Sequence, residues 1–118
     1  MFNLEINNNV YSFNFSIGFV RKINAQTVQM QNGIKKEVGL QMAVAGVMDR
    51  DPIDICNVLL AANEVAPGAK VTRTMLDNYL DDESTDIDTL CDEIVSFFEN
   101  SNATKRAVAK IREILANQ

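Results

Sequence analysis

Hydrophobic and polar residues alternate one by one at the start of the chain, over residues 2–6 and again over 10–15. A period of two is typical of β-strands. The three asparagines at 7–9 suit a tight turn between them, because asparagine tolerates positive φ and can hydrogen-bond its own backbone. The pattern therefore predicts an N-terminal β-hairpin. One side of this hairpin is aromatic, so another element must cover it.

From Ser16 the apolar residues recur at three- and four-residue steps, which is the period of a helix. The predicted helices cover residues 16–24, 37–48, 51–64, 72–80, 87–98 and 103–115. Ser16 and Asp51 are suitable N-caps, and Pro52 is placed where a first helical residue is expected. The polar stretch 25–36 predicts an extended or looped connection. We therefore expect a mostly helical α+β fold, with a hairpin followed by about six helices in one domain, 1–118.

The predicted helix 37–48 is apolar nearly all round, with polar side chains only at Glu37 and Gln41. A helix without a polar face is usually buried in the centre of a domain. Gly39 and Gly46 disfavour a helix relative to alanine. We therefore expect them to permit close packing against neighbouring elements.

Seven of the fourteen residues in 80–93 are carboxylates, which raises the question of a metal site. Counted from Asp82, positions 1, 3, 5 and 12 of a calcium loop would be Asp82, Ser84, Asp86 and Glu93. Position 6, however, is Ile87 where glycine is needed, and position 9 is Leu90, which offers no oxygen. Both belong to the apolar stripe of the following helix, so calcium is disfavoured and no metal ligands are assigned.

The acidic stretch is better explained as the entrance to a helix. Thr85 is the expected N-cap, with Asp88 at the third helical position in a variant of the capping box. Carboxylates at 86 and 88 lie where the helix dipole is positive. The three acids at 81–83 then form a solvated connector.

The composition argues against most enzyme chemistry and against general nucleic-acid binding. The chain has no histidine, which excludes histidine-based acid–base catalysis and histidine-containing triads. Its glycines are isolated, so no phosphate-binding loop or cofactor is expected. Carboxylate-only catalysis stays formally open. A net charge of −5 opposes general binding to phosphates.

Two cysteines, Cys56 and Cys91, lie far apart and inside apolar patterns. We expect buried thiols, with a disulfide or a metal ligand pair as the lesser alternative. The first residues lack the basic start and long apolar run of a secretory signal. No stretch approaches the roughly 18 apolar residues of a membrane span. A cytoplasmic location is therefore expected, with no membrane partner.

The order of these features resembles a known family. The quoted stretches are YSFNFSIGFVRKIN (11–24), NGIKKEVGLQMAVAG (32–46) and STDIDTLCDEIVSFFENSNATKRAVAKI (84–111). Together with the hairpin they resemble the tail assembly chaperones of long-tailed bacteriophages of Gram-positive hosts. The resemblance covers nearly the whole chain and rests on pattern and order, since it includes no catalytic signature.

The resemblance implies a non-enzymatic scaffold for tail assembly in a phage or prophage. Such chaperones bind the tape measure protein, keep it soluble and extended, and bring major tail (tube) protein subunits to it. The implied location is the host cytoplasm and not the mature virion. Self-association stays open. The alternative function is a small acidic helical adaptor or regulatory protein that binds a host protein.

Tape measure proteins are helical and amphipathic before assembly, so the candidate binding features are apolar edges and charged faces. These features are the edge of the N-terminal hairpin, Phe97 at the margin of its helix stripe, and the basic side of the last helix. The basic residues are Lys105, Arg106, Lys110 and Arg112. Each feature also has an ordinary interpretation: an exposed edge, a peripheral core residue, and a solvated face that pairs with the acids of 81–93.

Overall fold

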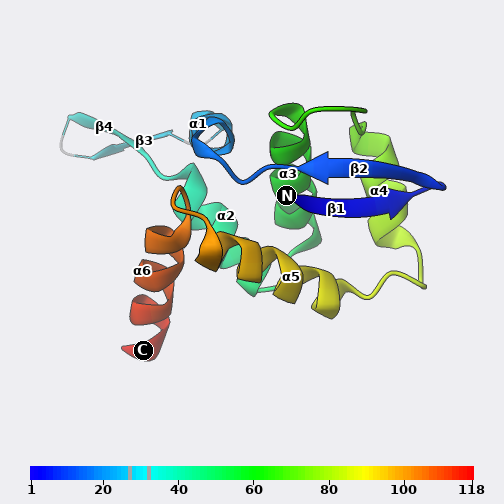
Figure 1. The fold of residues 1–118 in the computed structure, drawn as a ribbon. Helices are drawn as coiled ribbons and strands as arrows, with labels where there is room; N and C mark the ends of the chain where they lie inside the picture. The colour runs from blue at the N-terminus through cyan, green and yellow to red at the C-terminus, as the bar shows by residue number, and fades with distance from the viewer. Residues whose placement is uncertain (27, 32) are drawn as a thin grey trace.

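The computed structural model describes residues 1–26, 28–31 and 33–118, with the backbone alone for 28–31 and 34–37. Its elements are β1 (Phe2–Ile6), β2 (Asn9–Phe13), α1 (Ile17–Ala25), β3 (Val28–Gln31), β4 (Ile34–Glu37), α2 (Gly39–Met48), α3 (Pro52–Glu64), α4 (Arg73–Asp81), α5 (Ile87–Asn100) and α6 (Lys105–Ala116). The predicted mostly helical α+β fold is confirmed. The β1–β2 hairpin and α4 lie at one end of the molecule, and α6 lies at the other (Figure 1).

The N-terminal hairpin forms as predicted. Strands β1 and β2 pair in antiparallel register, with Phe2 opposite Phe13. Asn7 and Asn8 connect the strands with φ values of 53° and 66°. Two successive residues with positive φ match the twist of a two-residue hairpin turn, and asparagine tolerates this conformation better than most residues do.

A second antiparallel hairpin, which the sequence analysis did not predict, connects α1 to α2. It consists of β3 and β4, with Val28 opposite Glu37. Glu37 therefore ends a strand, and α2 begins two residues later than expected. Gly33 has a φ of 77°, which glycine adopts without strain. Thr27 and Asn32, which also belong to the predicted connection, lie outside the described residues.

An aromatic cluster fixes the first hairpin to the helices. It contains all six phenylalanines of the chain: Phe2, Phe13, Phe15, Phe19, Phe97 and Phe98. Phe15 makes an edge-on contact with Phe98 of α5, with ring centroids 5.0 Å apart. Edge-on and tilted arrangements are favoured between aromatic rings. Helices α1 and α5 thus cover the aromatic side of the hairpin. Exposure of these rings to water would be unfavourable in free energy.

The helices begin at residues that satisfy their first amide groups. The Oγ atom of Ser16 and the carboxylate of Asp51 accept hydrogen bonds from the first turns of α1 and α3, which confirms both predicted caps. Helix α2 has no cap of its own. Instead the Leu40 amide donates to Oδ1 of Asn24, at the end of α1, over 2.8 Å. This bond couples the start of α2 to the end of α1.

Close packing at both predicted glycines is confirmed. A Cβ atom on Gly39 would lie 2.0 Å from the backbone oxygen of Ile23. On Gly46 it would lie 2.0 Å from a carboxylate oxygen of Asp54. Real Cβ atoms do not approach other atoms so closely. Helix α2 therefore lies against α1 and α3 at distances that only glycine allows.

Asn63, near the end of α3, joins three segments of the chain. Its side chain is 1% exposed. The Nδ2 group donates to the carbonyls of Ser12 (3.0 Å) and Ala69 (3.1 Å), and Oδ1 accepts from the amide of Val71 (2.8 Å). A buried amide with this many partners fixes the position of the loop after α3 relative to β2.

Candidate protein-binding surface

Helix α2 packs against α1, α3, α5 and α6, as expected of a central helix, but its apolar surface is not covered on every side. One side, with Ala43, Val44 and Val47, is inside the core. On another side Met42 is 51% exposed. The sequence pattern could not show this, because an apolar helix looks the same whether its neighbours surround it or cover only part of it. Because the sequence of α2 has no polar face, any side that its neighbours leave uncovered must nevertheless be apolar.

We call this surface the α2–α6 groove. It is lined by Met42, Ala45 and Met48 of α2, by Ile111 and Leu115 of α6, and by Asp54 of α3. The hollow has a volume of about 460 Å³. A neighbouring hollow of about 310 Å³ shares Met42, Ala45 and Ile111 and extends the groove towards Val38.

The last helix contributes less to the core than its apolar stripe predicts. Helix α6 begins at Lys105, two residues later than expected. Val108 and Ile111 are buried, but Ile114 and Leu115 are 46% and 53% exposed. The C-terminal end of α6 extends away from the other helices (Figure 1), and these two side chains are covered only in part.

Two acidic side chains, Asp49 and Asp54, line the α2–α6 groove. Partial burial, with smaller contributions from the charges of Asp51 and Asp49, raises the pKa of the Asp54 carboxyl. Among the described residues, neither Asp49 nor Asp54 has an ion-pair partner. Two carboxylates without an ion-pair partner among the described residues therefore lie beside the apolar lining.

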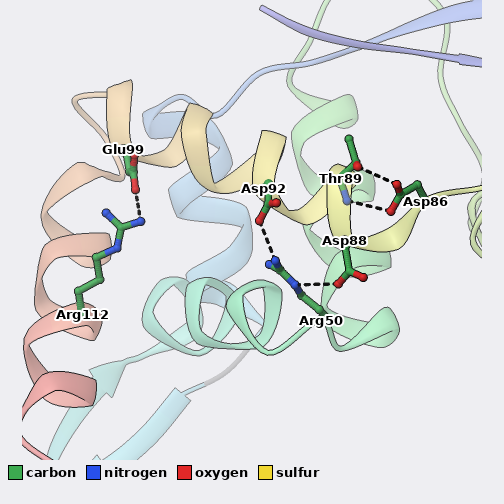
Figure 2. A network of polar contacts seen from close by, with 7 residues as sticks. All are labelled: Arg50, Asp86, Asp88, Thr89, Asp92, Glu99 and Arg112. Atoms are coloured by element: carbon green, nitrogen blue, oxygen red, sulfur yellow. Dashed lines mark hydrogen bonds and ion pairs between the residues drawn. The ribbon is translucent and has the colours of Figure 1, made fainter.

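The acids of α5 that were expected to pair with α6 pair with Arg50 instead. Arg50 contacts the carboxylates of Asp88 (3.2 Å) and Asp92 (2.7 Å), as Figure 2 shows. Its backbone has a φ of 61°, in the link between α2 and α3. From α6, Arg112 pairs with Glu99, which lies outside the acidic stretch. The predicted pairing of the basic side with residues 81–93 is therefore wrong for Arg112.

The N-cap of α5 is Asp86, which corrects the assignment to Thr85. The Asp86 carboxylate accepts from the amide of Thr89 (3.1 Å) and from its hydroxyl (2.8 Å), both drawn in Figure 2. The bond from the Thr89 amide is the main reason why the pKa of Asp86 is lowered. The Thr85 hydroxyl instead donates to the carbonyl of Tyr79 over 2.6 Å. The connector is also shorter than predicted, because α4 continues to Asp81.

A calcium loop does not fit this conformation. Ile87 is the first residue of α5, and Leu90 is 4% exposed in the core. The segment that would surround the ion is thus helical from its sixth position. No group of three or more metal-binding side chains occurs within the described part of the chain.

The binding residues predicted from the sequence lie on different parts of the structure. Phe97 is 37% exposed and contacts Phe2, with ring centroids 5.2 Å apart, so it forms the edge of the aromatic cluster. Arg106 and Lys110 line a hollow of about 250 Å³ between α6 and α2. Lys105 is exposed. Arg112, in contrast, pairs with Glu99 of α5.

The edge of the N-terminal hairpin remains available. Strands β1 and β2 form a two-stranded sheet, so each has one edge without a strand neighbour among the described residues. Val10 of β2 is 64% exposed. The hairpin is nevertheless tied down next to its end, where the Asn14 amide donates to the carbonyl of Ala62 over 3.0 Å.

Both cysteines are buried free thiols, as expected. Burial is the main cause of the raised pKa of Cys56 and of Cys91. A thiol with a raised pKa is protonated at neutral pH and therefore a poor nucleophile. Both residues act as small core side chains.

A small mostly helical domain with an uncovered apolar groove is typical of a protein-binding module. None of the described helices combines the length and the hydropathy needed to cross a membrane. Comparison with known families places the chain more specifically. The sequence model of the family described as phage tail assembly chaperone protein, TAC, matches residues 3–113. The chain belongs to this family, and the resemblance noted from the sequence is confirmed. No curated protein and no solved structure matches the chain.

Proposed function

We propose that this protein binds the tape measure protein of its phage tail, keeps it soluble and extended, and brings major tail protein subunits to it. The proposal is supported by membership of the tail assembly chaperone family. The structural observation that carries it is the uncovered apolar side of α2, where Met42 is 51% exposed. A chaperone for a helical, amphipathic client needs apolar surface that its own fold does not cover.

In this role the protein is a scaffold and not an enzyme. It acts in the host cytoplasm, on tail proteins before they are assembled, and is not retained in the mature virion. Buried, protonated thiols and acids engaged in caps and ion pairs are consistent with residues that serve the fold. Addition of millimolar Ca²⁺ or Mg²⁺ is expected to leave the melting temperature unchanged. A rise in the melting temperature would favour a metal-dependent activity.

The test is co-expression with the tape measure protein encoded in the same tail gene cluster. We expect the soluble fraction of the tape measure protein to rise and a complex of the two proteins to co-purify. An unchanged soluble fraction together with no co-purification would contradict the proposal. A tail gene on each side of this gene favours the tail function, whereas an isolated operon favours the adaptor for a host protein.

A further inference from the structure

We propose that the α2–α6 groove is the site that receives an amphipathic helix of the tape measure protein, with a lysine or arginine of that helix next to Asp54. This inference rests on the proposed function and names the surface that performs it. Three properties of the groove support it: its apolar lining, its length and the carboxylates of Asp49 and Asp54 in that lining.

The apolar lining matches the apolar face of a helix. Met42 and Leu115 are 51% and 53% exposed, and the buried Ile111 lines the groove with them. Two of the lining side chains, Met42 and Met48, are methionines. Methionine is flexible and polarisable, so a groove lined by it can accept helices with different sequences. This property suits a long client whose successive helical segments are not identical.

The groove is long enough for several anchoring side chains. Its lining on α2 extends from Val38 to Asp49, which at a rise of 1.5 Å per residue is roughly 16 Å, or three turns of helix. A helix of that length presents apolar side chains at positions i, i+3 or i+4, and i+7 on one face. Two or three of these would lie in the groove at once.

Two carboxylates at the groove favour a cation. Asp54 is half-buried and lies against Gly46, where a Cβ atom would be only 2.0 Å from its carboxylate oxygen. Glycine at 46 thus leaves room for a carboxylate at the groove. Asp49 lines the groove as well. A lysine or arginine of the client would form a charge-assisted hydrogen bond with Asp54 that the described residues of the free protein do not provide.

Two groove variants and two controls test this site. Met42→Glu places a charge in the apolar lining, and Ile17→Glu changes an equally exposed residue (55%) at the start of α1, away from the groove. Asp54→Asn removes the charge while preserving shape, and Glu83→Gln does the same at an exposed acid before α5. All four variants and the wild type are co-expressed with the tape measure protein, and the amount that co-purifies is measured.

We expect Met42→Glu and Asp54→Asn each to lower co-purification by about tenfold, and the two controls to leave it within about twofold of wild type. We also expect the binding of Asp54→Asn to depend less on salt concentration than that of the wild type, because one charge pair is absent. Stability separates binding from folding. Because burial raises the pKa of Asp54, its charged form is disfavoured in the folded state, and Asp54→Asn is expected to be at least as stable as wild type at pH 7.

Three results would overturn the inference. If the wild type binds the tape measure protein and both groove variants bind equally well, the groove is not the site, although the proposed function stands. If the wild type fails to bind, the proposed function and the inference fall together. If the wild type is a dimer in sedimentation velocity and Met42→Glu is a monomer that still binds, the groove belongs to a second copy of this chain.

Discussion

Replacing Asn63 by alanine is expected to cause a large decrease in the free energy of unfolding for a single substitution. The substitution removes three hydrogen bonds, from Nδ2 to the carbonyls of Ser12 and Ala69 and from the Val71 amide to Oδ1. At a net value of about 1 kcal/mol for each bond, the free energy of unfolding should fall by roughly 3 kcal/mol. The buried backbone groups left without partners would increase this loss. A domain of this size is stable by only about 5–15 kcal/mol, so the loss is readily measured.

The companion variant Asn63→Asp separates hydrogen bonding from side-chain volume. It preserves the acceptor for the Val71 amide but places a carboxylate against two carbonyl oxygens. Burial and the two carbonyl oxygens raise the pKa of this carboxyl, although the Val71 amide and the nearby Lys70 ammonium, which donates to the carbonyl of residue 63 over 3.1 Å, partly oppose the rise. The variant should therefore be less stable than wild type at pH 7 and should recover part of the difference as the pH falls through that raised pKa, since the protonated carboxyl can donate to one carbonyl.

Urea unfolding followed by far-ultraviolet circular dichroism measures both variants. Asn57→Ala is the matched control, because Asn57 is also on α3 but its Oδ1 makes one exposed hydrogen bond, with Arg73. The control should differ from wild type by no more than about 0.5 kcal/mol. If Asn63→Ala is equally mild, or if Asn63→Asp shows no additional pH dependence, the role of Asn63 as a junction is wrong.

Three further substitutions test other contacts by the same unfolding measurement. Gly39→Ala should lower the free energy of unfolding by about 3 kcal/mol, because the added Cβ would meet the Ile23 carbonyl at 2.0 Å. A decrease below about 0.5 kcal/mol would contradict the close approach of α1 and α2. Arg50→Gly should be about 1 kcal/mol more stable than Arg50→Ala. Both variants lose the ion pairs, but only glycine adopts the positive φ of residue 50 without strain. Equal stability of the two variants would show that this strain is absent. Thr85→Ala should lower the free energy of unfolding by about 1 kcal/mol, because the hydrogen bond to the Tyr79 carbonyl is lost. Binding of the tape measure protein should be unchanged. Loss of binding without loss of stability would give this residue a functional role.

Local chemistry explains which parts of the fold could be predicted from the sequence. The first hairpin was predictable because strand alternation and a turn of asparagines coincide within 13 residues. The start of α3 was predictable because Asp51 and Pro52 specify a helix start by themselves. At α5 two suitable caps stand side by side, and the geometry selects Asp86 over Thr85. A position error of one residue is typical at a helix boundary.

Features that depend on distant residues could not be predicted. The β3–β4 hairpin is a different case, because its local signal was missed. Val28 and Met30 alternate with Gln29 and Gln31 directly before Asn32-Gly33, a pair typical of hairpin turns. Arg50 reaches acids 38 and 42 residues further along the chain. The uncovered side of α2 depends on where α6 ends relative to it. For this reason the sequence suggested Phe97 and the basic residues of α6 as binding candidates and missed Met42 and Asp54.

Amide hydrogen exchange of the protein alone and in complex with the tape measure protein locates the binding surface. We expect slower exchange on binding at the amides of α2 (39–48) and α6 (105–116), because a helix seated between them covers both. The amides of the β1–β2 hairpin and of α4, at the other end of the molecule (Figure 1), should be unchanged. Slower exchange confined to the hairpin, or no change anywhere in the chain, would contradict the assignment of the groove as the binding site.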